Sequence, residues 1–219
     1  MLFLLLAALT LVGCGGSQNG EESSSDESGG SGDTITLKLA HQFAAPSGDE
    51  GDYRSLLAER FAKEVEDRSN GSIKVEVYPA DSLIKGAEHF NALQKGSLDA
   101  AIYLPFYDSG KVKDFSISLM PGIIKNSEQA WEWPESKIGE EVEKLMEDNG
   151  IKMLVWTWAP TTVATIGDTV VKKPEDVKGF KFRGAGSDSE AMFQELGAGI
   201  ASMASSELYS ALQSGVLDG

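Results

Sequence analysis

Two eight-residue segments, 92–99 (ALQKGSLD) and 211–218 (ALQSGVLD), share six identical positions although they begin 119 positions apart. In each segment the residues before the glycine predict the last turn of a helix, and the glycine can adopt the positive φ that often follows a helix. The residues after the glycine predict entry into a strand. This repeated helix-to-strand connection predicts a chain that builds two similar α/β units.

Hydrophobic periodicity extends this prediction along the chain. Alternating or continuous apolar runs predict strands at residues 35–39, 73–77, 98–104, 151–158 and 179–183. Apolar residues at helical spacing predict helices at 53–68, through 90–93 and at 138–146. Such alternation is typical of mainly parallel sheets with helices on their faces. In these sheets ligands bind beyond the carboxyl ends of the strands.

The first residues predict a lipoprotein leader. Residues 2–12 are apolar but too short to span a bilayer, which is typical of a signal peptide. Residues 11–14 (LVGC) match the bacterial lipobox, in which the cysteine is lipidated. Cys14 is the only cysteine of the chain and therefore cannot form an internal disulfide. The alternative is an ordinary buried cysteine.

Residues 15–33 contain mainly Gly, Ser and acidic residues, which predicts a flexible acidic tether. Five of the 34 acidic residues lie there, so most of the net charge of −15 belongs to the remaining chain. This acidity argues against nucleic acid, which requires clustered Lys and Arg. It does not exclude an anionic ligand, since one buried arginine can override the net charge locally.

The sequence offers little catalytic chemistry. It has two histidines, and we expect one of them, His89, to be partly exposed on a helix. No His/Cys cluster has zinc spacing, and neither a nucleophile elbow nor a glycine-rich phosphate loop is present. The adjacent Glu140 and Glu141 are typical of a solvated helix face. We therefore expect no enzyme activity, no cofactor and no metal site.

Arg183 is the most informative basic residue. It ends a predicted strand (GFKFR) directly before a Gly-Ala-Gly break, which predicts that its guanidinium faces the ligand crevice. There it can hold a carboxylate through two parallel hydrogen bonds, which Lys cannot reproduce. The alternative is an ion pair with a surface acid.

Several segments resemble the extracytoplasmic solute receptors of TRAP transporters, of the DctP type. They are residues 173–183 (KPEDVKGFKFR), 190–198 (EAMFQELGA) and 207–219 (ELYSALQSGVLDG), with His41-Gln42, residues 70–79 and residues 92–99 in agreement. The resemblance covers residues 34–219 and implies a bilobed, periplasmic-binding-protein-like α/β fold. Lobe I would comprise residues 34–158 and lobe II residues 159–219. Because the family continues further, the resemblance implies a C-terminally truncated chain with an incomplete second lobe.

The resemblance also implies a binding site. Arg183 falls on the family arginine that holds a substrate carboxylate. Family members usually carry a second basic or polar ligand contact some twenty residues before this arginine. At that place this chain offers only the threonines Thr161, Thr162 and Thr165. The cleft candidates at predicted strand ends, each with packing as the alternative, are His41, Gln42, Tyr103, Phe106, Tyr107 and Trp158. Trp156, which precedes Trp158 in the same predicted strand, is either a crevice or a core residue.

The implied function is a non-catalytic receptor, lipid-anchored outside the cytoplasm. It captures a small organic acid by hinge closure and delivers it to a TRAP permease in the membrane. The acid itself stays open among dicarboxylates, 2-oxo acids, sugar acids and aromatic acids. The alternatives are a solute-binding lipoprotein of an ABC importer, and a surface lipoprotein that acts as an enzyme or spacer.

Overall fold

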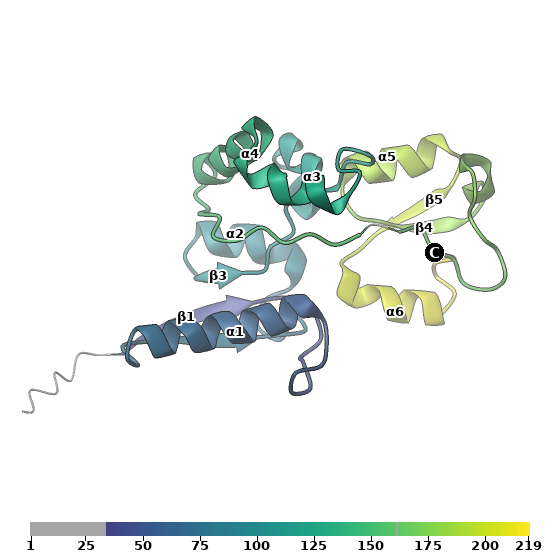
Figure 1. The fold of residues 1–219 in the computed structure, drawn as a ribbon. Helices are drawn as coiled ribbons and strands as arrows, with labels where there is room; N and C mark the ends of the chain where they lie inside the picture. The colour runs from purple at the N-terminus through teal and green to yellow at the C-terminus, as the bar shows by residue number, and fades with distance from the viewer. Residues whose placement is uncertain (1–33, 161) are drawn as a thin grey trace, which may run out of the picture. The chain divides into compact units, whose positions relative to one another are not determined.

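The structure is a computed structural model that describes residues 34–160 and 162–219 (Figure 1). The predictions for the leader, Cys14, the acidic tether and Thr161 lie outside these residues. Contacts place the described residues in a single unit, Asp33–Gly219. Within the described residues, no helix combines the length and the apolar composition that a membrane span requires.

The first sheet has three parallel strands in the order β2-β1-β3. They are β1 (Ile35–Ala40), β2 (Ile73–Tyr78) and β3 (Ala100–Ala101). Helix α1 (Tyr53–Arg68) connects β1 to β2, and its buried Ala58 packs against Leu39 and Val75 of the sheet. The predicted helix 53–68 and the strands at 35–39 and 73–77 are therefore confirmed.

Shorter helices lie between β2 and β3 and after β3. They are η1 (Gly86–Glu88), α2 (His89–Gln94), η2 (Pro105–Asp108), η3 (Lys113–Leu119), α3 (Ser127–Glu132), η4 (Trp133–Glu135) and α4 (Lys137–Asp148). Phe90, Phe115 and Met146 form the buried cluster that joins α2, η3 and α4. Helix α4 confirms the helix predicted at 138–146.

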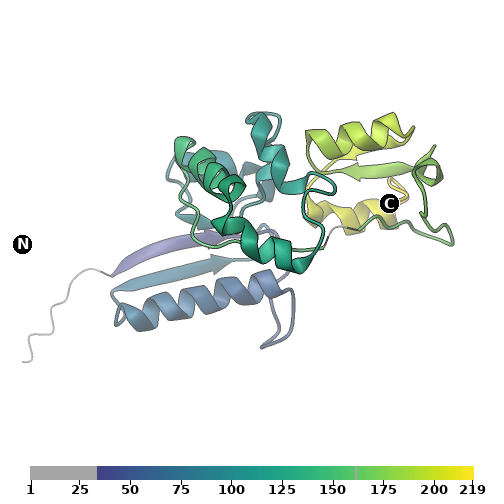
Figure 2. The ribbon, with the colours of Figure 1, turned by 45° about the horizontal axis from the view of Figure 1, so that its top comes forward.

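The second sheet pairs β4 (Lys181–Gly184) with β5 (Gly199–Ser202) in parallel. Helix α5 (Ser187–Glu195) connects the two strands, α6 (Ser205–Gln213) follows them, and η5 (Pro174–Val177) precedes them. Figures 1 and 2 show α5 and α6 on opposite sides of this sheet. Phe182 of β4 is buried with Val177 and Ala198, so its neighbour Arg183 lies on the other face of the strand.

The sequence repeat corresponds to a repeated structure. Gly96 after α2 has φ +67, and Gly215 after α6 has φ +70, so both use the left-handed region that favours glycine. Two residues later, Leu98 and Leu217 are almost fully buried, with 1 % and 0 % exposure. Both copies therefore turn the chain from a helix into the core.

The aspartate that ends each repeat makes the same contact. Asp99 Oδ2 accepts a hydrogen bond of 2.8 Å from the backbone N–H of Lys38 in β1. Asp218 Oδ2 accepts one of 2.8 Å from the backbone N–H of Lys181 in β4. In both copies the backbone N–H of the aspartate also returns a bond to the lysine carbonyl. Both sheets thus have the same aspartate contact to the backbone of a strand lysine.

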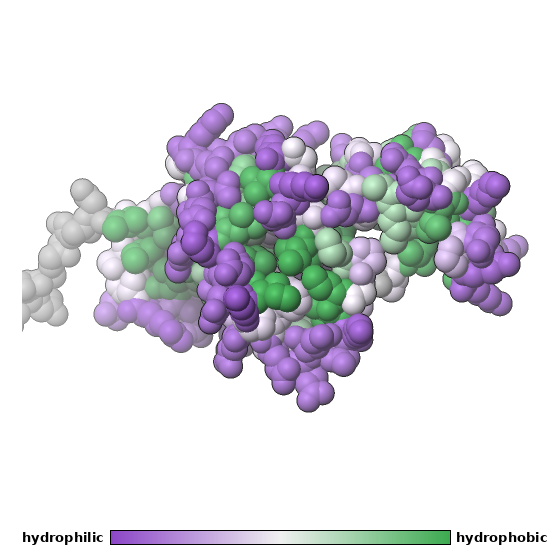
Figure 3. Space-filling model, turned by 90° about the horizontal axis from the view of Figure 1, so that it is seen from above, coloured by the Kyte–Doolittle hydropathy of each residue, from purple (hydrophilic) through white to green (hydrophobic). Residues whose placement is uncertain are grey.

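Two predicted strands are largely absent. The run 98–104 pairs with β1 only at Ala100–Ala101, because the chain turns at Leu104 and Pro105 into η2. The run 151–158 forms no strand, since none of the described strands exchanges ladder hydrogen bonds with it. Leu154 and Val155 of this run are 68 % and 56 % exposed. Figure 3 shows that one face of the molecule carries exposed apolar side chains among polar ones.

Candidate functional site

Arg183 is anchored at the carboxyl end of β4. Its Nε donates a hydrogen bond of 3.1 Å to the Met203 carbonyl. Its Nη2 donates one of 2.7 Å to the Tyr107 hydroxyl. Within residues 34–160 and 162–219, its Nη1 has no hydrogen-bond partner in the protein. The side chain is thus held in place while one of its amino groups stays available to a ligand.

Arg183 also lacks an acidic partner among the residues that the structure describes. The salt bridges of the described residues involve Arg54, Lys63, Arg68, Lys74, Lys111, Lys144 and Lys152. Arg183 joins none of them, although the chain has 34 acidic and 19 basic residues. The ion pair with a surface acid, left open from the sequence, is therefore not formed within the described chain. A half-buried guanidinium without a carboxylate is suited to binding an anion.

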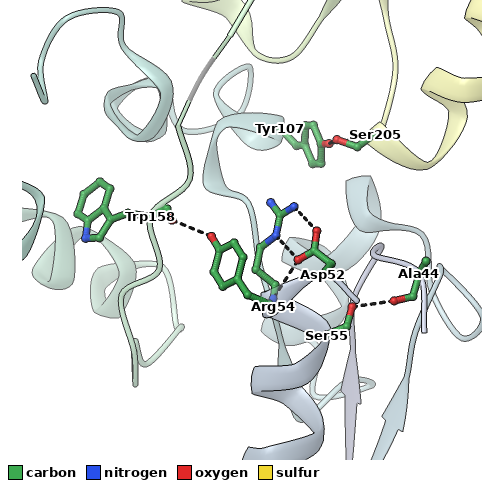
Figure 4. A network of polar contacts seen from close by, with 8 residues as sticks. Ala44, Asp52, Arg54, Ser55, Tyr107, Trp158 and Ser205 are labelled. Carbon is green, nitrogen blue, oxygen red and sulfur yellow. Dashed lines mark hydrogen bonds and ion pairs between the residues drawn. The ribbon is translucent and has the colours of Figure 1, made fainter. Parts of the chain in front are cut away.

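The Tyr107 hydroxyl is the centre of the site. Tyr107 lies in η2, which begins with Pro105 after the extended Leu104. The hydroxyl accepts hydrogen bonds from Arg183 Nη2 and from the backbone N–H of Ser205, at 2.7 and 3.1 Å. It lies 3.0 Å from Ser205 Oγ and donates to Gln42 Oε1 at 3.2 Å. Figure 4 shows its contact with Ser205. One hydroxyl therefore links β4, α6 and the end of β1.

Ser205 is the first residue of α6, and the sequence analysis missed it. The first N–H groups of a helix have no intrahelical partner and carry partial positive charge. The preceding Ala204 provides no side-chain hydrogen bond to them. Helix α6 thus adds a backbone donor and a hydroxyl beside Arg183. The signal was the Ser-Ser pair at the beginning of a helical run, which is typical of a helix start.

His41 and Gln42 follow β1 and are buried, with 0 % and 5 % exposure. Both ring nitrogens of His41 and Nε2 of Gln42 have no partner within the described chain. An unpaired buried polar atom costs about 1–3 kcal/mol, so a polar ligand would gain by contacting these atoms. Burial lowers the pKa of His41. Its neutral ring therefore offers one donor and one acceptor.

Arg54 is a second cation that the sequence analysis missed. It lies in the first turn of α1, where a positive charge opposes the helix dipole. Asp52 binds its Nε and Nη2 at 2.8 and 2.6 Å, and its Cζ lies 3.6 Å from the centre of the Phe43 ring. This pairing raises the pKa of Arg54 and lowers that of Asp52. An arginine placed against the dipole was the signal for it in the sequence.

The aromatic candidates Phe106 and Tyr103 lie in different places. Phe106 lies beside Tyr107, with the ring centres 4.7 Å apart. Tyr103 instead packs between Phe90 and Phe115, and its hydroxyl donates to Asp108 at 3.0 Å. Burial is the main cause that raises the pKa of Tyr103. Tyr103 is therefore part of the aromatic cluster and makes no bond to Tyr107 or Arg183.

Trp158 lies close to the start of α1. Its carbonyl accepts a hydrogen bond of 2.8 Å from the Tyr53 hydroxyl (Figure 4). Its ring stacks on Trp156 at 5.6 Å and meets Trp133 edge to face. The indole N–H of Trp156 donates to Glu143 of α4. The tryptophans thus pack mainly against one another and α4.

The other polar candidates stay apart from Arg183. His89 is 1 % exposed and its Nε2 lies 3.2 Å from the Ile84 carbonyl, so the expectation of partial exposure was wrong. The Thr165 hydroxyl bonds the Thr169 carbonyl. Glu140 and Glu141 are exposed on α4 as expected. Among the described residues, no group of three His, Cys, Asp or Glu side chains gathers as a metal site.

The α/β fold has parallel sheets, and an arginine at a strand end has no acidic partner within residues 34–160 and 162–219. Such an arrangement is suited to a small-molecule site. The sequence profile of DctP, the bacterial extracellular solute-binding proteins of family 7, matches residues 47–219. The chain therefore belongs to this family. This confirms the resemblance to DctP-type TRAP receptors, in preference to the receptor of an ABC importer.

Known relatives agree with this assignment. A solute-binding protein of Albidiferax ferrireducens is 40 % identical over 185 residues, which cover 84 % of this chain. The C4-dicarboxylate-binding periplasmic protein DctP of Rhodobacter capsulatus is 33 % identical over 187 residues, again 84 % of this chain. The chain spans about half the length of these relatives, 54 % of each.

A solved structure also matches the fold. It is a TRAP periplasmic solute binding protein from Rhodoferax ferrireducens with bound malonate, 40 % identical to this chain. The TM-score is 0.79, and the match covers 83 % of this chain and 57 % of that structure. The predicted fold class, a periplasmic-binding-protein-like α/β fold with parallel sheets, is thus confirmed.

Proposed function

We propose that the protein is an extracytoplasmic receptor that captures a small organic acid and delivers it to a TRAP-type permease. Arg183 carries this proposal, because it is a half-buried guanidinium without a carboxylate partner in the described chain. Its Nη1 and the N-terminus of α6 would bind one carboxylate of the ligand. One relative is named for binding C4-dicarboxylates, and the matched solved structure contains bound malonate. Both support an acid as the ligand.

Other candidate residues would complete the pocket around this carboxylate. We place Tyr107 and Gln42 next to Arg183, since hydrogen bonds connect all three. His41 would add a neutral donor and acceptor from the end of β1. Phe106 would cover the apolar side. Tyr103 and Trp158 would shape the wall behind these residues rather than bind the acid directly.

The proposed organisation is a receptor with two lobes and a lipid anchor. Lobe I, residues 34–158, would hold the first sheet and lobe II, residues 159–219, the second. Ligand binding would favour a closed arrangement that docks on the permease. Lipidation of Cys14 would attach the receptor to the membrane outside the cytoplasm. Mass spectrometry of the membrane fraction tests this anchor, since a Cys14→Ala variant would remain unmodified.

The experiment for the ligand site is calorimetric titration of the full protein that carries this chain with small carboxylates. We expect saturable binding of at least one acid and its loss in Arg183→Ala. Arg183→Lys keeps the charge but cannot form the paired hydrogen bonds, so its affinity should also fall. Wild-type affinity in Arg183→Ala would remove Arg183 from the site. Absence of acid binding by folded wild-type protein would refute the proposed ligand class.

A further inference from the structure

The Arg54–Asp52 pair is a rigid polar group at the start of α1. Asp52 caps the helix by accepting from the Arg54 backbone N–H at 2.9 Å. The same carboxylate binds Nε and Nη2 of the Arg54 side chain, while the Phe43 ring stacks against its guanidinium. These contacts fix the guanidinium in one orientation. Capping needs only the Asp52 carboxylate, so it does not explain why Arg54 is there.

The pair keeps hydrogen-bonding capacity at its surface. Within the described residues Arg54 Nη1 has no partner in the protein. Asp52 Oδ2 accepts one bond, from Nη2, and retains a second lone pair. The Arg54 and Asp52 side chains are 23 % and 29 % exposed, so a small molecule can reach both. The pair therefore presents a donor and an acceptor side by side.

The pair differs from Arg183 in charge. Arg183 has no carboxylate partner in the described chain, whereas the charge of Arg54 is offset by Asp52 at 2.6 Å. A carboxylate placed against the pair would meet the negative charge of Asp52 as well as the guanidinium. A hydroxyl carries no charge and both donates and accepts hydrogen bonds. Local charge and bonding capacity thus favour a hydroxyl at this position.

The pair also faces the candidate site. In Figure 4 the Arg54 guanidinium points from α1 toward the side where Tyr107 and Ser205 lie. The Tyr53 hydroxyl, in the same first turn of α1, donates a hydrogen bond to the Trp158 carbonyl and so ties this turn to residues 151–158.

We infer that the Arg54–Asp52 pair binds a hydroxyl group of the ligand, and that the receptor selects hydroxy acids over their deoxy analogues. This inference rests on the proposed function, because Arg183 and the N-terminus of α6 would hold the ligand's carboxylate. Arg54 donates Nη1–H to the hydroxyl oxygen, and the hydroxyl donates to Asp52 Oδ2. The second, charged end of a dicarboxylate is not bound by this pair.

Matched pairs of acids that differ by a single hydroxyl test the inference. Calorimetric titration of the full protein would compare malate with succinate and lactate with propionate, using both enantiomers of each hydroxy acid. We expect at least one hydroxy acid to bind more tightly than its deoxy partner, by about tenfold or more, which corresponds to a hydrogen bond to a charged group. In Arg54→Gln this preference should disappear, while the affinity for the deoxy acid changes less than about threefold.

Controls separate this contact from a change in folding. Arg60→Gln replaces an exposed arginine on the same helix and should keep the preference. Asp52→Asn keeps a side-chain oxygen that can cap the helix, and it should reduce the preference for the hydroxy acid. This variant tests the inference if Arg54→Gln does not fold. Circular dichroism and urea denaturation would establish that each variant is folded.

Two results would overturn the inference. One is wild-type protein that binds both members of each pair equally. The other is Arg54→Gln protein that loses affinity equally for malate and succinate, which would assign Arg54 to a carboxylate. Failure of the proposed function gives a different result, since folded wild-type protein would then bind none of the four acids.

Discussion

Arg183 and Tyr107 are 76 residues apart in the sequence, and a hydrogen bond of 2.7 Å connects the guanidinium of one to the hydroxyl of the other. The Arg183 Cζ lies 5.7 Å from the centre of the Tyr107 ring. Because this hydroxyl also accepts from the Ser205 N–H, it orients the guanidinium and the α6 N-terminus toward one place. The bond thereby couples η2 to the second sheet.

A Tyr107→Phe substitution removes this hydroxyl and retains the ring. Arg183 loses one of its two side-chain anchors, and Ser205 N and Gln42 Oε1 lose a partner. We expect affinity for the acid ligand to fall about tenfold, as for one hydrogen bond to a charged group. Calorimetric titration measures the change, with Tyr209→Phe as the control at a 73 % exposed tyrosine. Tighter binding by Tyr107→Phe would instead mean that the hydroxyl competes with the ligand.

The buried histidines predict loss of stability in mild acid. Burial lowers the pKa of His41 and of His89 below the ordinary value of 6.5. Below that pH the unfolded chain takes up protons that the folded chain does not, so the free energy of unfolding decreases as the pH falls. Above it both histidines are neutral in both states, and their contribution no longer changes. Urea denaturation at about pH 7.5 and about pH 5.5 measures this difference.

The double variant His41→Gln, His89→Gln is the control for this prediction. Its free energy of unfolding at neutral pH is expected to change, but the loss between the two pH values should shrink. Asp and Glu titrate mainly below this window, so they contribute little to the difference. An unchanged pH dependence in the double variant would show that other groups cause it.

Local sequence signals predicted much of the fold because they act within a few residues. Helix α1 spans the predicted residues since Asp52 caps its start and Gly71, with φ +77, follows its end. The repeated Gly-x-Leu-Asp ending predicted two similar connections, which Leu98 and Leu217 complete by burial. The position of Arg183 at a strand end followed from the Gly-Ala-Gly break after it.

The remainder depends on partners distant in sequence. Residues 151–158 have strand-like composition, but a strand also needs a neighbouring backbone, and no described strand provides one. The burial of His89 depends on packing that its helical position did not reveal. Tyr107 meets Ser205 and Arg183 only through the tertiary fold, so their grouping was not predictable from spacing.

Gly186 is required where the chain turns from β4 into α5. Its φ is +111, and an added Cβ would lie 2.7 Å from the Phe106 carbonyl oxygen. Gly186→Ala should therefore lower the free energy of unfolding by about 2 kcal/mol or more, through backbone strain and this clash. Urea denaturation measures the loss. Gly110→Ala is the matched control, since nothing lies within 4 Å of its added Cβ. Equal stability of the two variants would contradict the predicted clash.

The aspartates of the repeat should contribute equally to their two sheets. Asp99 and Asp218 each bind the backbone N–H of a strand lysine at 2.8 Å. Asp99→Ala and Asp218→Ala should each reduce the free energy of unfolding by about 1 kcal/mol, because the strand N–H loses its acceptor. Asn keeps an acceptor oxygen, so Asp99→Asn and Asp218→Asn should retain most of the stability in urea denaturation. If the Asn variants lose as much as the Ala variants, the carboxylate charge, and not the hydrogen bond, stabilises the repeat.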